Sequence, residues 1–82
     1  MIAGTVVGTV GATIRVAGLQ ALPLVLVEAD GDPVTTLVAG NPLSAGVGER
    51  VVVSAGAAAR LALGAADSAV DAAIVAIVDR SI

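Results

Sequence analysis

The sequence predicts a mainly β fold, a small closed or nearly closed barrel of five short strands with one short helix. Five segments of strand-forming residues are separated by glycine, proline and asparagine, the pattern of short strands joined by turns. One run of small residues between two of these segments has the signals of a helix instead. A chain of 82 residues has room for one domain, which we place over residues 1–82.

The first strand is expected over residues 2–10, where β-branched residues surround Gly4 and Gly8. Strict alternation places Val6 and Val10 on the same face as both glycines. A glycine inside a strand often marks a bend or a close approach of two backbones, as at the corner of a barrel. We therefore expect this strand to bend.

The next two strands are expected to form a hairpin over residues 24–28 and 34–39. Asp30-Gly31 between them is a hairpin turn signal, and Pro33 follows directly.

A loop opened by Asn41-Pro42 then runs through Gly46 and Gly48 to the fourth strand, residues 49–54. The glycines indicate a tight turn before this strand.

The helix is expected over residues 56–63, because Ser54 near its start is a capping residue and Gly64 is a stop signal. The last strand is expected over residues 72–79, directly after Asp71.

The composition predicts an oligomer. A chain this short buries only roughly 60–65% of its unfolded surface, and this one has no aromatic residue and no cysteine to strengthen its core. Residues 24–27, 51–53 and 72–78 are apolar on both faces, whereas an antiparallel sheet in a lone small domain normally has a polar face toward water. A neighbouring subunit is the expected cover.

Charge and hydropathy exclude several classes of protein. The mean hydropathy is high, +1.04, but no uncharged stretch reaches the about 20 apolar residues of a spanning helix. The first basic residue, Arg15, lies after the apolar start, which is unlike a secretory signal. A net charge of −3 without lysine or aromatic residues argues against nucleic acid. We expect a cytoplasmic protein that binds neither membrane nor nucleic acid.

The motifs that could carry chemistry are incomplete. The glycines at 46 and 48 satisfy only the start of G-x-G-x-x-G and precede a strand, and a P-loop needs a lysine that the chain lacks. Ser54 has no histidine to activate it, so we interpret it as a helix cap. Asp30 and Asp32 have only the first two positions of a calcium loop, and we interpret them as a solvated turn. We expect no catalytic residue, no cofactor and no metal.

Two motifs carry a resemblance to a known family. Residues 45–49 (AGVGE), 51–53 (VVV) and 56–60 (GAAAR) closely resemble the G-A-G-x-G-E…V-x-V…G-S-A-A-R signature of the bacterial microcompartment vertex family. Residues 70–79 (VDAAIVAIVD) are similar to the ending of that family, and residues 4–9 (GTVVGT) match its opening strand. The chain differs at Asn41, Ser44 and Ala57, where the family usually has Asp, Gly and Ser.

The resemblance implies an OB-like barrel that assembles as a cyclic pentamer and caps the vertices of a microcompartment shell beside hexameric shell proteins. It implies a structural protein and no enzyme, located in the shell in the cytoplasm, and it favours an aldehyde-processing metabolosome as the compartment. The alternative is a small OB-like module that binds a ligand or an oligonucleotide.

The resemblance also assigns candidate residues. The motif or subunit-interface residues are Gly46, Gly48, Glu49, Gly56, Arg60 and Asp71. The loop with Asn41, Ser44 and Gly46 is expected around the five-fold axis, where its neutral polar side chains would make any opening narrow and uncharged. For Glu49 and Arg60 two hypotheses stay open: at least one satisfies a backbone group or an opposite charge near a subunit contact, or both are solvated charges.

Overall fold

The computed structural model describes residues 1–11, 23–64 and 70–79. In these ranges the elements are β1 (Ile2–Val10), β2 (Leu24–Ala29), β3 (Thr35–Gly40), β4 (Arg50–Ala55), α1 (Gly56–Ala62) and β5 (Ala72–Ile77). Their type and order are as predicted, and each boundary lies within two residues of the expected one.

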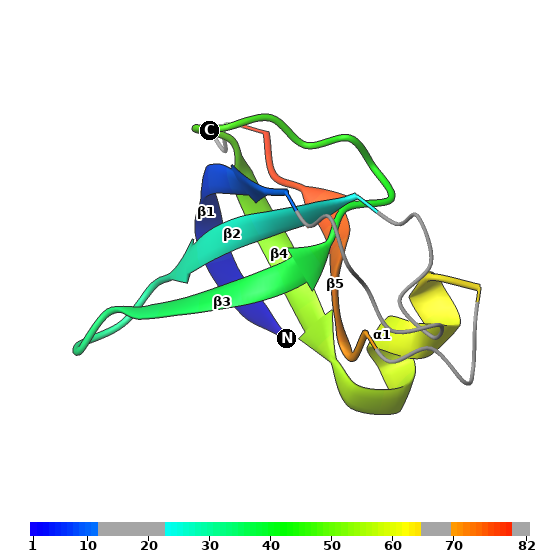
Figure 1. Ribbon diagram of the computed structural model, residues 1–82. Helices are drawn as coiled ribbons and strands as arrows, with labels where there is room; N and C mark the ends of the chain where they lie inside the picture. Colours follow the sequence, from blue (N-terminus) through cyan, green and yellow to red (C-terminus); the bar gives the residue numbers. More distant parts are fainter. Residues whose placement is uncertain (12–22, 65–69, 80–82) are drawn as a thin grey trace.

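The strands close into a barrel in the order β1-β2-β3-β5-β4 (Figure 1). The described ladders are antiparallel except between β3 and β5, which run parallel and meet at one pair, Gly40 opposite Ala73. A five-stranded barrel that is only just closed at one seam is the OB type of architecture. The predicted fold class is confirmed.

The first strand bends, as its glycines predict, but its faces are not those of strict alternation. Val6 lies opposite Val27, whereas Gly8 lies opposite Leu26, so the register shifts by one residue between them. Because neighbouring residues of a strand point to opposite faces, this bulge turns Gly8 and Val10 away from the face that Val6 occupies. The expectation that Val6 and Val10 share a face is wrong for this reason.

Small and medium aliphatic side chains fill the barrel. The core cluster consists of Val6, Val25, Val27, Ala39, Ala45, Val51, Val53 and Ile74. Every strand contributes to it, and Ala45 brings in the loop before β4. Since no side chain in it is larger than isoleucine, the barrel is narrow.

The helix begins without the predicted cap. Its N-cap residue is Ala55, which makes no side-chain capping bond, and Ser54 is a buried residue of β4. The interpretation of Ser54 as a helix cap is therefore wrong, because the strand extends one residue further than expected.

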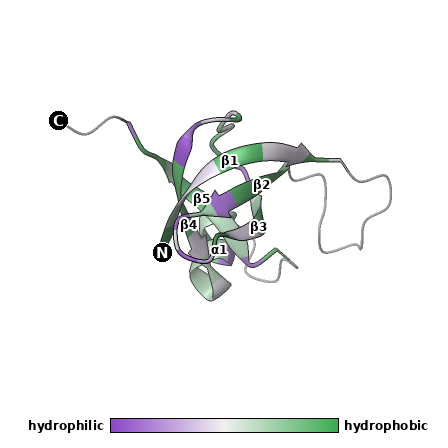
Figure 2. Cartoon of the chain, turned by 90° about the vertical axis from the view of Figure 1, so that its left-hand side faces the viewer, coloured by the Kyte–Doolittle hydropathy of each residue, from purple (hydrophilic) through white to green (hydrophobic). Residues whose placement is uncertain are grey.

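The outer surface of the barrel keeps apolar side chains in contact with solvent. Hydrophobic residues run along both β1 and β2 (Figure 2), and those of β1 include the exposed Ile2 and Val7. Large apolar side chains that are exposed in the single chain are Met1, Ile2, Val7, Val34, Val38, Leu43, Val47, Leu61, Ile77 and Val78. They occur on β1, β3, β5, α1 and the loop before β4, so one chain does not cover its own apolar exterior.

Gly4 allows the close approach of β1 and β2. A Cβ atom at this position would lie 2.7 Å from the carbonyl oxygen of Glu28 and 2.8 Å from a methyl carbon of Val27. The first of these is a backbone atom of the neighbouring strand, which can move only if the ladder moves.

We predict that Gly4→Ala lowers the free energy of unfolding by about 1–3 kcal/mol, because the added methyl group overpacks the strand pair. The matched control is Gly11→Ala, where a Cβ atom would meet nothing within 4 Å. Chemical denaturation of both variants measures the difference. Equal stability of the two variants would contradict the close approach.

Candidate functional site

The loop between β3 and β4 contains most of the residues that the sequence singles out, and Asn41 holds its first half in place. The Asn41 side chain is buried and bonds twice to one residue, donating from Nδ2 to the Ala45 carbonyl at 2.9 Å and accepting at Oδ1 from the Ala45 N–H at 2.9 Å. Its backbone N–H donates to the carbonyl of Pro23. Asn41 is therefore a structural clamp, because both hydrogen bonds of its amide hold Ala45 within the loop.

Ser44 lies within this clamp and has an unusual backbone. Its φ of 57° is in the left-handed region, which costs a residue with a Cβ atom about 1–2 kcal/mol. Its side chain is exposed. A glycine would take this conformation without strain, which gives a physical reason for the glycine of the family signature at this position.

Glu49 holds the second half of the loop. Its Oε1 atom accepts a hydrogen bond from the Gly46 N–H at 2.6 Å, and a Cβ atom on Gly46 would lie 3.4 Å from that oxygen. Gly48 has a φ of 92°, which only glycine adopts without strain. The turn thus depends on Gly48 and on the Glu49 carboxylate, which satisfies the backbone N–H of Gly46.

The turn is also fixed to the barrel. The Gly48 N–H donates to the carbonyl of Val6, and the Val6 N–H donates to the carbonyl of Glu49, at 2.8 and 3.0 Å. These two bonds continue the pairing of β1 beyond the start of β4. The glycine-rich stretch is a structural corner, and the N–H groups of Gly46, Gly48 and Glu49 are bonded within the chain.

The other candidate residues lie at the opposite end of β4. The Gly56 N–H donates to the carbonyl of Asp71 at 2.7 Å, which ties the start of α1 to the start of β5. Arg60 lies in the last turn of α1 and is half-buried. The structure therefore brings Gly46, Gly48 and Glu49 together and places Gly56, Arg60 and Asp71 in a second group.

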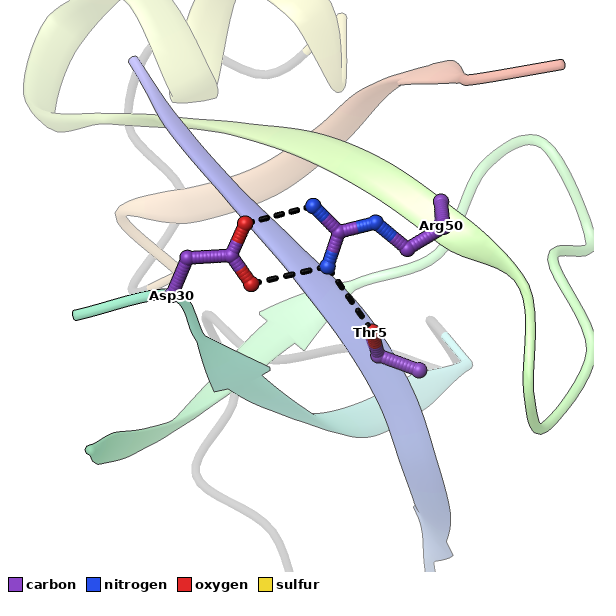
Figure 3. A network of polar contacts seen from close by, with 3 residues as sticks. All are labelled: Thr5, Asp30 and Arg50. Carbon is purple, nitrogen blue, oxygen red and sulfur yellow. Dashed lines mark hydrogen bonds and ion pairs between the residues drawn. The ribbon is translucent and has the colours of Figure 1, made fainter. Parts of the chain in front are cut away.

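Sequence reasoning missed a polar network on the outside of the barrel (Figure 3). The two terminal nitrogens of Arg50 donate to the two carboxylate oxygens of Asp30, one of them at 2.7 Å, and Nη1 also donates to Oγ1 of Thr5 at 3.0 Å. The hydrogen bond from Arg50 holds the pKa of the Asp30 carboxyl below its usual value. The turn that contains Asp30 is exposed, as expected, but this carboxylate has a partner.

The signal for this network lies in the strand register. Thr5 of β1 pairs with Arg50 of β4 on one side and with Glu28 of β2 on the other, so Arg50 and the end of β2 meet across β1. A sequence does not reveal which strands flank β1, and the pair is 20 residues apart in the chain. We name Thr5, Asp30 and Arg50 the outer clamp.

Ser54 is the serine that the sequence offers as a candidate nucleophile, and it is buried in β4. No group of three or more metal-ligating side chains is found among residues 1–11, 23–64 and 70–79. No described helix is long and apolar enough to cross a membrane. The arrangements that the site does contain hold loops and strands in place, which defines a structural barrel.

Known proteins identify the family of this barrel. Residues 1–79 match the family described as "Ethanolamine utilisation protein EutN/carboxysome". The chain belongs to this family of microcompartment vertex proteins, as the signature in its sequence predicted. No protein with a curated description matches it significantly.

Several solved structures are similar over nearly the whole chain. The GrpN pentameric microcompartment shell protein from Rhodospirillum rubrum has 35% identity and a TM-score of 0.84, covering 100% of this chain and 98% of that one. CcmL from Nostoc sp. PCC 7120 has 36% identity and a TM-score of 0.86, with coverages of 96% and 88%. The ethanolamine utilization protein EutN from Escherichia coli has 31% identity and a TM-score of 0.86, with coverages of 100% and 89%. These relatives are shell proteins and not enzymes.

We predict that Asn41→Asp lowers the free energy of unfolding by about 1–3 kcal/mol at neutral pH, because the Ala45 carbonyl loses its donor. Burial beside a carbonyl oxygen raises the pKa of the introduced carboxyl above about 3.9. The penalty is therefore smallest below that value, where the protonated carboxyl can donate, and grows as the pH rises. Melting curves from pH 3 to 7 measure it. Asn41→Ala, which has no titratable group, is the control and should lose stability at every pH.

We predict that Arg50→Gln lowers the melting temperature above about pH 5 and has little effect at the lowest pH. The pKa of Asp30 is lowered in the folded chain, so its stabilising contribution is present above the usual 3.8 and is lost as the pH falls through the lower folded value. The shift is expected to be a few degrees, since both partners are about half exposed. Glu28→Gln, at an exposed carboxylate on β2, is the control. A pH-independent effect of Arg50→Gln would contradict the role of Asp30.

Proposed function

We propose that this chain is a structural shell protein that forms a homopentamer and closes the vertices of a bacterial microcompartment. The observation that carries the proposal is the similarity to a pentameric shell protein over all of this chain and 98% of that chain, at 35% identity. The apolar exterior of the barrel supports the same conclusion, because a lone chain leaves it in water.

The proposed role is geometric. A contact between two different surfaces of neighbouring copies closes into a ring when its rotation allows it. A ring of five inserted among hexagonal tiles introduces the curvature that a flat layer lacks. The partners of this chain are then its own copies and hexameric shell proteins, and the location is the shell of a compartment in the cytoplasm.

The loop of residues 41–46 is our proposal for the surroundings of the five-fold axis. Since the amide of Asn41 is used to hold Ala45, the exposed hydroxyl of Ser44 is the polar group that this loop would offer to an opening. The described part of the loop before Glu49 has no charged side chain. A small neutral opening remains our prediction for the axis.

The aldehyde-processing cargo stays a prediction of the sequence resemblance. The similarity to a carboxysome protein and to an ethanolamine utilization protein is close to equal, with identities of 36% and 31%. The genes beside this one would identify the enclosed enzymes.

The ring is tested by native mass spectrometry of the purified chain. A species of about 39 kDa, five times the chain mass of 7.8 kDa, is expected at micromolar concentration. A dominant monomer would overturn the proposal. Retention on heparin at low salt would instead favour the OB-like oligonucleotide module.

The vertex role is tested by co-expression with the neighbouring shell genes and electron microscopy. Closed polyhedral shells are expected with this chain, and elongated or open ones without it. The enclosed enzymes should keep their activity in lysate in both cases, because the chain has a geometric role. Closed shells that form equally well without this or any other vertex protein would refute it.

A further inference from the structure

Two apolar features lie at opposite ends of the molecule. The β2–β3 hairpin projects from the barrel on one side, and α1 lies on the other side (Figure 1). Gly31, Asp32, Pro33 and Val34 are all exposed at the hairpin tip. A head-to-tail contact needs two different surfaces on each copy, and these two ends supply them.

The surface at α1 is an open hollow of about 320 Å³ lined by Ala57, Ala58, Arg60 and Leu61. Leu61 is 78% exposed and lines the hollow together with two alanines. The hollow is large enough for the side chains of a turn, and its lining is apolar apart from one guanidinium group. A helix with an apolar outer side normally packs against another element.

The hairpin tip carries two exposed apolar residues beside an exposed carboxylate. Val34 is 58% exposed and directly follows Pro33, which is also exposed. The outer clamp holds the tip where it leaves β2, because Arg50 of β4 bonds to Asp30, the residue that follows β2 and precedes the tip. The tip therefore projects from a fixed base as a short arm.

The charges beside the two surfaces are opposite. Asp32 lies two residues before Val34 at the tip, and Arg60 lines the hollow. Of the two arginines in the described ranges, Arg50 is paired with Asp30, while Arg60 has no ion pair within the part of the chain that the structure describes. Asp32 likewise has no ion pair among those residues. Such complementarity fixes the register of a contact and suppresses wrong ones.

From these observations we propose that the hairpin tip of one copy inserts Pro33 and Val34 into the α1 hollow of the next copy, with Asp32 facing Arg60. This contact names the surfaces that make the ring and so rests on the proposed function. The contact pairs Arg60 with a carboxylate of the next copy. This is the first of the two hypotheses that the sequence left open for Glu49 and Arg60, an opposite charge near a subunit contact. The contact also gives the outer clamp a role, because the clamp positions the arm.

The geometry is tested by crosslinking, which is clean because the chain has no cysteine. A double variant with Val34→Cys and Leu61→Cys is expected to form disulfide-linked species from dimer up to pentamer under oxidising conditions, resolved on a non-reducing gel. Each single variant should form almost none, since its cysteine faces a position on the next copy that is not a cysteine. Val7→Cys with Leu61→Cys, which pairs the hollow with an exposed valine of β1, is the control. A ladder from the control but none from the tip variant would overturn the contact.

The charge pair is tested by reversal. Asp32→Lys and Arg60→Glu should each weaken the ring by about 10-fold or more in dissociation constant, and the variant carrying both changes should recover most of the loss. Glu28→Lys, the same charge change on the stem of the hairpin, is the control and should leave the ring intact. Circular dichroism of each variant confirms the barrel fold.

These outcomes separate the two proposals. If the wild-type chain is pentameric but neither the ladder nor the recovery is seen, the tip-and-hollow contact is wrong and the vertex function stands. If the wild-type chain is monomeric, the vertex function itself fails. If Val34→Cys alone forms dimers in high yield, two tips meet each other, and the head-to-tail contact is wrong.

Discussion

The barrel depends on β1 pairing closely on both sides, with β2 along one edge and with β4 along the other. Gly4 lies where this pairing is tightest, because the backbone of β2 occupies the space that a side chain would need. The bulge after Val6 then redirects the strand, and the Gly48 and Glu49 backbones continue its ladder. The core side chains are no larger than isoleucine. The strands β2 and β4 therefore have to lie close to β1 for the barrel to close without a cavity.

The outer clamp follows from the same closure. Because β1 is flanked by both strands, Arg50 can reach across it to Asp30 while bonding to Thr5 on the way. Both partners are about half exposed, so the pair adds little to the stability of the barrel. Its consequence is geometric: it joins the start of β4 to the end of β2, where the hairpin tip begins, and so fixes the direction in which that tip projects.

The sequence predicted the elements well because each is bounded by local chemistry, such as Asp30-Gly31 before β3 and Gly64 after α1. It failed where a long-range contact decides the outcome. Ser54 was expected to cap a helix, but pairing with β5 keeps it in a strand. The bulge at Val6 and the bond from Arg50 to Asp30 both depend on which strands become neighbours, and no local pattern specifies that. The loop glycines were recognised, whereas the amide clamp of Asn41 was not, since it needs the position of Ala45 in space.

The absence of aromatic residues connects the fold to assembly. A core of valine, alanine and isoleucine gives up the large buried area that a phenylalanine or tryptophan supplies, so the barrel gains little from burial within one chain. The same composition leaves small apolar side chains outside, where a flat or hollow surface lets another copy approach closely, as at Ala57 and Ala58. Polar residues that would make such a surface stable in water are few, because only 13% of the chain is charged. In the proposed ring, a chain of this kind completes its hydrophobic burial between copies, and the closed barrel is one sector of that ring.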